Sequence, residues 1–393
     1  MSTPEAVQPD SLMPSSVPLD ASGVAEPAGH SDPAARWIVR RSDNPRTREQ
    51  REALLRELRF GTEFTDHLAR AVWTPEKGWH DLTVQPYGPI TLDPGSAVLH
   101  YAQEVFEGLK AYRHKNGSVW AFRPEANARR FMRSAHRLAL PVLEEADFLG
   151  SLEALVRVDH EWVPSEAGAS LYLRPFMFAS ERFLGVRPSR LVEYMVIASP
   201  VGPYFTHGFT PVSIWVANDF HRSGPGGTGA AKCGGNYAAS LLPQQVAYDN
   251  GCEQVCFLDA ATGTLLEELG GMNMFVVGSD GSVSTPALTG TILEGVTRDS
   301  IIQLLADAGR RVDERSITLQ ELKDGIRSGE VAEVFACGTA AVITPIGRLV
   351  GEGFDLTVAD GRPGSTTTTL HRQLTDIQYG RAVDPHGWMR RLV

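Results

Sequence analysis

A single lysine, Lys232, lies in a run of small residues, AAKCGGNYAAS (230–240). The loop before it, GPGGTG (224–229), is so rich in glycine that six of the twelve residues at positions 224–235 are glycine. Glycine allows positive φ angles and lets another group come close to the backbone. Two interpretations follow: the lysine is a surface charge on a flexible loop, or its amine is directed into a pocket that receives a large, flat ligand.

An acidic pair ends an apolar strand in LLEELGGMNMF (265–275). One interpretation is a strand edge that turns into solvent. If the side chain of Glu268 is buried instead, its charge requires a cationic partner or a proton donor. A protonated nitrogen in a heterocyclic ring would meet that requirement.

Three features could bind phosphate. GVTRDS (295–300) places backbone N–H groups and the Thr297 hydroxyl at the start of an expected helix, which is either an anion site or simply a capped helix. Arg130 lies on an amphipathic helix among other arginines, where a solvated surface is the alternative. The loop GPGGTGAAK lacks the G-K-[ST] ending of a nucleotide-binding loop, which argues against an NTPase.

The segment CGTAA (337–341) predicts a tight turn after a strand, either an ordinary β-turn or a set of N–H groups that receives a carboxylate. A lysine amine, a helix-end phosphate site and a carboxylate suited to a pyridinium are together what pyridoxal phosphate needs. The lysine would bond to the cofactor, the carboxylate would keep the ring nitrogen protonated, and the glycines would let the backbone approach the ring.

Hydrophobic periodicity indicates the elements that must position these residues. In the first half we expect one helix that begins at Arg51 and a second helix over 123–140. We also expect strands at 82–87, 118–123, 170–178 and 192–205, and a hinge between the two halves of the chain at 199–203. In the second half we expect a strand at 212–217, a helix over 237–248, a hairpin over 253–268, a strand at 272–278, a helix opening at 295, and a strand with a tight turn over 333–346.

Bulk composition excludes several classes of protein. The 393 residues suffice for two or three domains, and the net charge of −10 argues against nucleic-acid binding. No run approaches the roughly 18 apolar residues of a membrane span. The four cysteines include no CxxC pair, so they predict neither a disulfide scaffold nor a metal-binding site. A cytoplasmic protein is therefore expected. Residues 1–35 lack aromatic residues and predict a disordered tail.

The chain resembles branched-chain amino acid aminotransferases, which are fold type IV pyridoxal phosphate enzymes. The resemblance runs from about residue 55 to the terminal HGWM (386–389). It rests on FGTEFTDHL (60–68), LHYAQEVFEGLKAY (99–112), LYLRP (171–175), PVGPYF (200–205), AAKCGGNYAASL (230–241), EELGGMNMF (267–275), TGTILEGVTRDS (289–300) and ACGTAAVITP (336–345).

The resemblance implies an α+β fold of two domains with the cofactor at their interface. A smaller N-terminal α/β domain would span 36–202, a loop 203–211, and a larger domain with a β-barrel-like core 212–393. It also implies transfer of the amino group of leucine, isoleucine or valine to 2-oxoglutarate. The alternatives are a D-amino acid aminotransferase, an aminodeoxychorismate lyase, or a non-catalytic ligand-binding relative.

Residue roles follow from the same resemblance. Lys232 would be the Schiff-base lysine and the acid/base of the proton shift. The implied cofactor contacts are Tyr237, Glu268, Arg130, Val296, Thr297 and Thr339. The implied substrate contacts are Phe60, Tyr101, Phe106, Tyr172, Tyr204, Arg174, Thr339 and Ala340, with Leu184 and Val186 of the loop FLGV (183–186) reaching the partner's site in a homodimer.

The sequence departs in two ways from the pattern that the resemblance implies. Gly271 stands where many members carry a threonine, so a side-chain contact is missing there. Some animal members carry a redox CxxC after the GTA turn, and Ala341 and Thr344 occupy those positions here. We therefore expect no redox switch at the turn.

Overall fold

The computed structural model describes residues 32–202 and 209–393, and Pro33–Val393 cluster into one compact unit. The predicted tail lies outside the described residues up to residue 31. Pro33–Arg36 already form a short 3-10 helix, in which Ala34 is buried against the first core. The described chain therefore begins a few residues before the predicted end of the tail.

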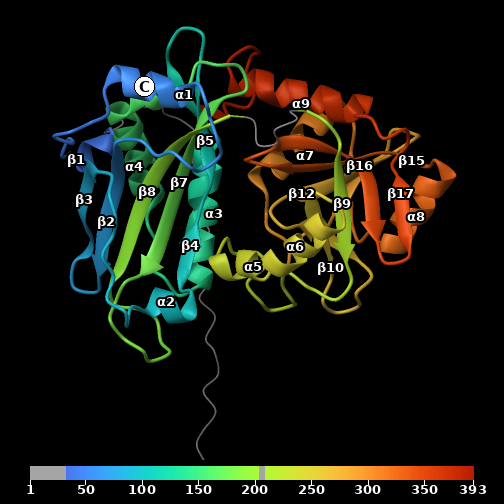
Figure 1. The fold of residues 1–393 in the computed structure, drawn as a ribbon, viewed down its shortest axis with the longest axis horizontal. Coiled ribbons are helices and arrows are strands. Elements are labelled where there is room, and N and C mark those ends of the chain that lie inside the picture. The colour runs from blue at the N-terminus through green and yellow to red at the C-terminus, as the bar shows by residue number, and fades with distance from the viewer. Residues whose placement is uncertain (1–31, 203–208) are drawn as a thin grey trace, which may run out of the picture. The chain divides into compact units, whose positions relative to one another are not determined.

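Among the described residues, nine strands form a first sheet in the order β1-β3-β2-β8-β7-β5-β6-β18, with β4 paired to β7 (Figure 1). Their bounds are β1 Ile38–Val39, β2 His67–Thr74, β3 Gly78–Pro86, β4 Glu104–Phe106, β5 Leu109–Arg113, β6 Val119–Phe122, β7 Ser170–Ala179, β8 Val192–Val201 and β18 Met389–Arg391. The last strand of the chain therefore pairs with a strand of the first half. The predicted division into domains stays a prediction.

A second sheet, counted over the same described residues, also has nine strands, in the order β11-β10-β9-β16-β15-β12-β13-β14, with β17 paired to β16. Their bounds are β9 Val212–Ala217, β10 Gln254–Leu258, β11 Leu266–Leu269, β12 Asn273–Gly278, β13 Val283–Pro286, β14 Val312–Arg315, β15 Val331–Gly338, β16 Val342–Gly351 and β17 Phe354–Thr357. Parallel pairs of β9 with β10 and with β16 make this sheet mixed.

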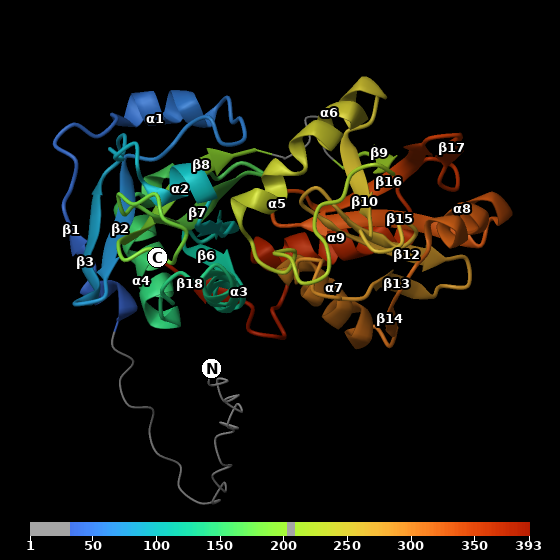
Figure 2. The ribbon, with the colours of Figure 1, turned by 90° about the horizontal axis from the view of Figure 1, so that it is seen from below.

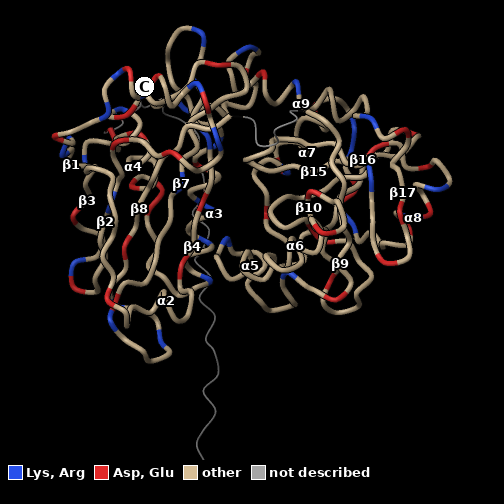
Figure 3. The backbone as a smooth tube through the Cα atoms, viewed as in Figure 1, with Lys and Arg blue, Asp and Glu red and all other residues tan. Residues whose placement is uncertain are grey.

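The helices lie mostly in the connections between strands. They are α1 Arg48–Leu55, α2 Ala97–Tyr101, α3 Pro124–Arg137, α4 Glu145–Val158, α5 Gly234–Ala238, α6 Leu241–Asp249, α7 Val296–Asp307, α8 Leu319–Ser328 and α9 Ser365–Gln378. Figure 2 shows α3 and α4 side by side along the first sheet. Basic and acidic residues are interspersed along the backbone (Figure 3). No helix in the described part of the chain is long and apolar enough to cross a membrane.

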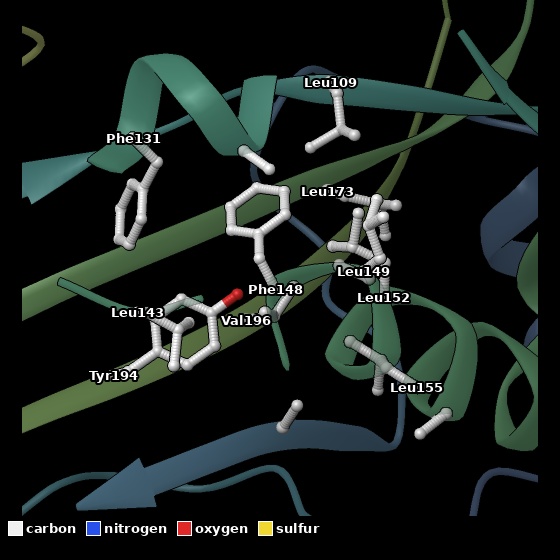
Figure 4. Close-up of a cluster of buried hydrophobic side chains, with 14 of the residues drawn as sticks. Leu109, Phe131, Leu143, Phe148, Leu149, Leu152, Leu155, Leu173, Tyr194 and Val196 are labelled. Carbon is white, nitrogen blue, oxygen red and sulfur yellow. The ribbon is translucent and has the colours of Figure 1, made fainter. Parts of the chain in front are cut away.

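The core of the first half explains why α3 forms where the sequence predicts it. Pro124 at the first helical position suits a helix start, because proline lacks the N–H that would be unpaired there. Phe131 on α3 packs against Phe148 on α4 and Tyr194 on β8 (Figure 4). The opposite side of α3 carries exposed arginines, so its amphipathic pattern is confirmed.

Two expectations about elements are wrong in detail. The helix expected over 237–248 is split into α5 and α6 between Ala239 and Ser240. Pro243 accounts for the break, because it has no N–H to donate to the Ala239 carbonyl and its ring would clash with that group. Residues 199–201 are not a hinge but are paired with β7, and most of the expected loop (203–208) lies outside the described residues.

Candidate active site

A cavity of about 200 Å³ brings together residues from both sheets. Twelve of the predicted site residues line it: Phe60, Phe106, Arg130, Tyr172, Arg174, Lys232, Tyr237, Glu268, Val296, Thr297, Thr339 and Ala340. These residues are widely separated in the sequence, so the fold itself assembles the cavity.

Lys232 is held at both its backbone and its side chain. Its N–H donates to the Ser134 hydroxyl on α3 at 2.9 Å, and its carbonyl accepts from the Phe106 N–H at 2.9 Å. The Nζ atom lies 2.6 Å from the Tyr237 hydroxyl and 4.8 Å from the centre of the Phe106 ring. The amine is therefore directed into the cavity, which excludes the interpretation of Lys232 as a surface charge.

The glycines around Lys232 do not have the expected role. No residue of 224–231 and neither of the two glycines after Cys233 lines the cavity in the described part of the chain. A Cβ at Gly229 would overlap the Thr291 carbonyl, and one at Gly234 would overlap the Glu104 carboxylate, which accepts the Gly234 N–H. These glycines let chain segments pack against one another and so fix the backbone on both sides of the lysine.

Glu268 on β11 is 2% exposed and lies on the cavity wall. One of its oxygens is 2.9 Å from a guanidinium nitrogen of Arg222 and accepts the Leu293 N–H at 2.8 Å. The Asn273 amide donates to the other oxygen at 3.4 Å. Burial raises the pKa of Glu268, and the charge of Arg222 lowers it only in part. The site therefore holds a carboxylate whose negative charge is incompletely compensated.

Arg130 on α3 is 4% exposed, so the alternative of a solvated surface arginine is excluded. Its Nε and Nη2 atoms donate to the two oxygens of Glu107 at 2.6 and 2.8 Å, and its Nη1 donates to the Glu294 carbonyl at 3.1 Å. Burial alone would raise the pKa of Glu107, but the charge and hydrogen bonds of Arg130 outweigh it and lower that pKa. Two of the five guanidinium N–H groups remain for a ligand.

The N-terminus of a helix and one turn complete the polar part of the cavity wall. Val296 and Thr297 are the first residues of α7, so their N–H groups lie at a helix N-terminus. Thr339 and Ala340 form the turn between β15 and β16, which confirms the tight turn predicted there. The buried amine of Lys110 on β5 donates to the Ala340 carbonyl at 2.7 Å and ties this turn to the first sheet.

The remaining cavity wall is aromatic. The rings of Phe60 and Tyr172 meet edge-on with their centres 5.1 Å apart. The guanidinium of Arg174 lies over Phe106 at 4.8 Å and over Tyr172 at 5.4 Å. Its Nε atom is buried and has no hydrogen-bond partner among the described residues. The wall thus combines an apolar surface with one cation that retains donor capacity.

Four predicted site residues do not line this cavity. Tyr101 on α2 donates its hydroxyl to the Leu184 carbonyl instead. Leu184 and Val186 are 61% and 87% exposed. Tyr204 lies outside the described residues.

Several residues that position the site side chains were not predicted from the sequence. Glu107, Arg222, Asn273 and Ser134 each contact a predicted site residue. Glu107 did leave a signal, because it is an acidic residue inside an apolar stretch, VFEGL, that is buried throughout most of its length. Arg222 left no comparable signal, because the stretch around it, NDFHRSG (218–224), is mostly polar.

Comparison with known proteins identifies the family. Residues 104–349 match the family described as Amino-transferase class IV. The chain belongs to the class IV aminotransferases. A branched-chain-amino-acid aminotransferase of Mycobacterium tuberculosis is 54% identical over 360 residues, which cover 91% of this chain and 98% of that protein.

Solved branched-chain amino acid aminotransferases share the fold. The Escherichia coli branched-chain amino acid aminotransferase has a TM-score of 0.69 and 28% identity, covering 83% of this chain and 100% of that one. The T.th. enzyme, solved with pyridoxamine 5'-phosphate, has a TM-score of 0.68 and 26% identity, covering 83% of this chain and 99% of that one. The predicted α+β arrangement of fold type IV is confirmed.

At the first departure from the aminotransferase pattern, Gly271 lines the cavity, and a Cβ there would have only Tyr237 in ordinary contact, at 3.8 Å. The glycine is therefore not required by crowding. At the second, Ala341 and Thr344 offer no thiols, and all four cysteines of this chain are free and buried.

Proposed function

We propose that this chain is a branched-chain amino acid transaminase that exchanges amino groups between leucine, isoleucine or valine and 2-oxoglutarate. The observation that carries the proposal is the Lys232 amine, held 2.6 Å from the Tyr237 hydroxyl in a cavity that also presents Glu268. The 54% identity to a protein named for this activity, over 91% of the chain, supports the choice of substrates.

The residues present fit pyridoxal phosphate as the cofactor. The start of α7 and the two remaining N–H groups of Arg130 suit a phosphate, and the buried carboxylate of Glu268 suits a protonated ring nitrogen. When bound, the cofactor supplies a carbonyl that takes up the amino group and a ring that accepts an electron pair. Tyr237 is placed to donate a hydrogen bond to an oxygen beside the Lys232 amine.

Lys232 is the residue that we assign to proton transfer. Its amine would hold the cofactor at its carbonyl carbon between turnovers and, once released, would take the proton from the substrate Cα and deliver it to that carbon of the cofactor. Glu268 stabilises positive charge on the ring nitrogen while negative charge develops at Cα. The bonds from Ser134 and Phe106 to the Lys232 backbone keep the amine in position during both transfers.

Substrate recognition divides between two parts of the cavity wall. We propose that backbone N–H groups of Thr339 and Ala340 bind the α-carboxylate. The rings of Phe60, Phe106 and Tyr172 would receive an aliphatic side chain. The Nε of Arg174, which has no hydrogen-bond partner among the residues that the structure describes, would donate to the distal carboxylate of glutamate, so one pocket accepts both substrates.

The functional unit is proposed to be a cytoplasmic homodimer. Leu184 and Val186 are apolar and highly exposed, which favours burial against another surface. Because the Tyr101 hydroxyl bonds to the Leu184 carbonyl, we propose that all three residues enter the partner's cavity together. Buried free thiols suit a reducing compartment. Light scattering should give twice the chain mass; a monomer with full activity would contradict the shared site.

A substrate panel tests the function. With 2-oxoglutarate as acceptor, L-leucine, L-isoleucine and L-valine should each give glutamate, whereas D-alanine should give none. Activity with the D-amino acid alone would replace the proposal by that of a D-amino acid aminotransferase.

The assignment of Lys232 has its own test. Lys232→Ala should still bind pyridoxal phosphate weakly through Arg130 and α7 but should not turn over. Borohydride reduction of the wild-type holoenzyme should fix the cofactor on the peptide that contains Lys232, as read by mass spectrometry. Turnover of Lys232→Ala near the wild-type rate would remove the residue from the mechanism.

A further inference from the structure

Glu267, the neighbour of Glu268 on β11, is a second buried carboxylate for which the proposed mechanism has no use. It is 4% exposed and does not line the main cavity. It lines a separate cavity of about 190 Å³ beside Thr291, whose hydroxyl donates to its Oε1 atom. Its Oε2 atom is buried without a hydrogen-bond partner in the described part of the chain. A buried carboxylate oxygen without a hydrogen-bond partner requires an explanation.

Arg222 connects the two carboxylates. Its guanidinium lies 2.9 Å from Glu268, and its charge lowers the pKa of Glu267 as well as that of Glu268. Its remaining hydrogen bonds go to the carbonyls of Gly229 and Thr291, which carry no charge. Arg222 thus contacts Glu268 directly and reaches Glu267 through Thr291, whose carbonyl accepts from the guanidinium and whose hydroxyl donates to Glu267.

The three charged groups Glu267, Arg222 and Glu268, taken alone, would be balanced by one further cation. With both carboxylates ionised, Glu267, Arg222 and Glu268 together carry one net negative charge. A protonated ring nitrogen beside Glu268 makes the sum zero. If Glu267 is uncharged, the same proton leaves one net positive charge in a low-dielectric environment, where charge interactions are strong.

From this balance we propose that Glu267 is a positioning residue for charge: acting through Arg222, its negative charge keeps the cofactor's ring nitrogen protonated opposite Glu268. The inference rests on the proposed function, because it requires pyridoxal phosphate in the main cavity. Without the charge of Glu267, the guanidinium would neutralise Glu268 and weaken its hold on the ring proton.

Burial raises the pKa of Glu267, and the Thr291 hydroxyl and Arg222 oppose that effect. Charged and titratable groups face Glu267 from each neighbouring segment; they are Asp259, His221, Arg222, Cys256, Glu268 and Arg315. The Asp259 carboxylate is already occupied by N–H groups of residues 262, 264 and 265. Of these groups, Arg222 is the cation that contacts Glu268 and so links Glu267 to the main cavity.

The test is the protonation of the ring nitrogen in holoenzyme prepared with ¹⁵N-labelled pyridoxal phosphate, followed by its ¹⁵N chemical shift as a function of pH. Glu267→Gln keeps the shape of the side chain but removes its charge. We expect its ring nitrogen to bind the proton at least about tenfold more weakly than the wild type, a loss of roughly 1.4 kcal/mol. Thr291→Val, which removes the hydrogen bond to Glu267 together with the hydroxyl contact to Thr289, should shift the titration in the same direction by less.

Glu333→Gln is the matched control, because Glu333 is also buried in the second sheet but is bonded to Thr366 and Thr367. Its titration should equal that of the wild type. A wild-type titration in both Glu267→Gln and Thr291→Val would overturn the inference while leaving the proposed function intact, and so would an equal shift in Glu333→Gln. If Glu267→Gln does not fold, Thr291→Val decides alone. Wild-type protein that binds no cofactor would overturn both proposals.

Discussion

Two buried arginine–glutamate pairs border the same cavity and present opposite charges to it. In the pair Arg130–Glu107 the arginine lines the cavity, and the glutamate lies behind it. In the pair Arg222–Glu268 the glutamate lines the cavity, and the arginine lies behind it. The part of the wall at Arg130 therefore suits an anionic phosphate, and the part at Glu268 suits a cationic ring nitrogen. The type of residue that faces the ligand, rather than the presence of an ion pair, sets the function of each part.

The two pairs also differ in how completely their charges are compensated. Both oxygens of Glu107 accept from Arg130, and the Asn127 amide adds a bond at 2.8 Å, so the pKa of Glu107 is lowered despite its burial. Glu268 has one contact with Arg222, and burial keeps its pKa raised. The first pair therefore serves to keep the site rigid. In the second pair, the incompletely compensated charge of Glu268 can stabilise a proton on the ligand.

Breaking the first pair should have the largest effect on stability. Glu107→Gln leaves the buried Arg130 charge without a counter-ion, and loss of one partner of a buried pair typically costs about 3–5 kcal/mol. Urea unfolding of the protein without cofactor measures this change. Glu161→Gln, which breaks an exposed contact with Arg51, is the control and should change stability by less than about 1 kcal/mol. A similar small effect in Glu107→Gln would contradict the difference between the pairs.

Lys110 sharpens the comparison because it is a buried cation bonded to a carbonyl rather than to a carboxylate. Burial lowers its pKa from 10.5 to about 8. Between these values the unfolded chain binds more protons than the folded chain, so the stability that Lys110 contributes rises with pH, by roughly 3 kcal/mol in total. Urea midpoints at the two ends of this range should show a smaller rise in Lys110→Met than in the wild type. Equal rises would mean that Lys110 is not desolvated.

The cysteines near the second pair should show the smallest effect. Burial, with the charges of Glu267 and Glu268, raises the pKa of Cys256 to about 12 and keeps it a neutral thiol near neutral pH. Cys233, next to Lys232, is also buried. Mild peroxide followed by added thiol should therefore leave transaminase activity unchanged. A loss that thiol reverses, mapped to Cys233 by mass spectrometry, would show that this cysteine is reactive after all.

The same comparison explains which parts of the site could be predicted from the sequence. Lys232 and Glu268 stand out locally, one among small residues and the other at the end of an apolar strand, and the start of α7 follows from its own motif. The partners Glu107 and Arg222 could not be assigned, because residues far apart in the chain meet only through sheet pairing and helix packing. The break between α5 and α6 was readable, since Pro243 is a local signal.

Arg130 and Glu268 give the most direct test of the central claim, that Arg130 serves to bind the cofactor and Glu268 serves the chemistry. Arg130→Lys keeps a cation opposite Glu107, so the fold is preserved while the hydrogen-bonding fork toward the phosphate is lost. The phosphate charge is constant during the reaction, so this change should weaken cofactor affinity roughly tenfold or more and leave the rate at saturating cofactor largely intact. Glu268→Gln should keep the cofactor bound and slow proton transfer by roughly 10²–10³.

The decisive measurement is single-turnover conversion of leucine at saturating pyridoxal phosphate in the wild type and both variants. The account predicts a near wild-type rate for Arg130→Lys and a rate lower by roughly 10²–10³ for Glu268→Gln. Equal rates for Glu268→Gln and the wild type would contradict it.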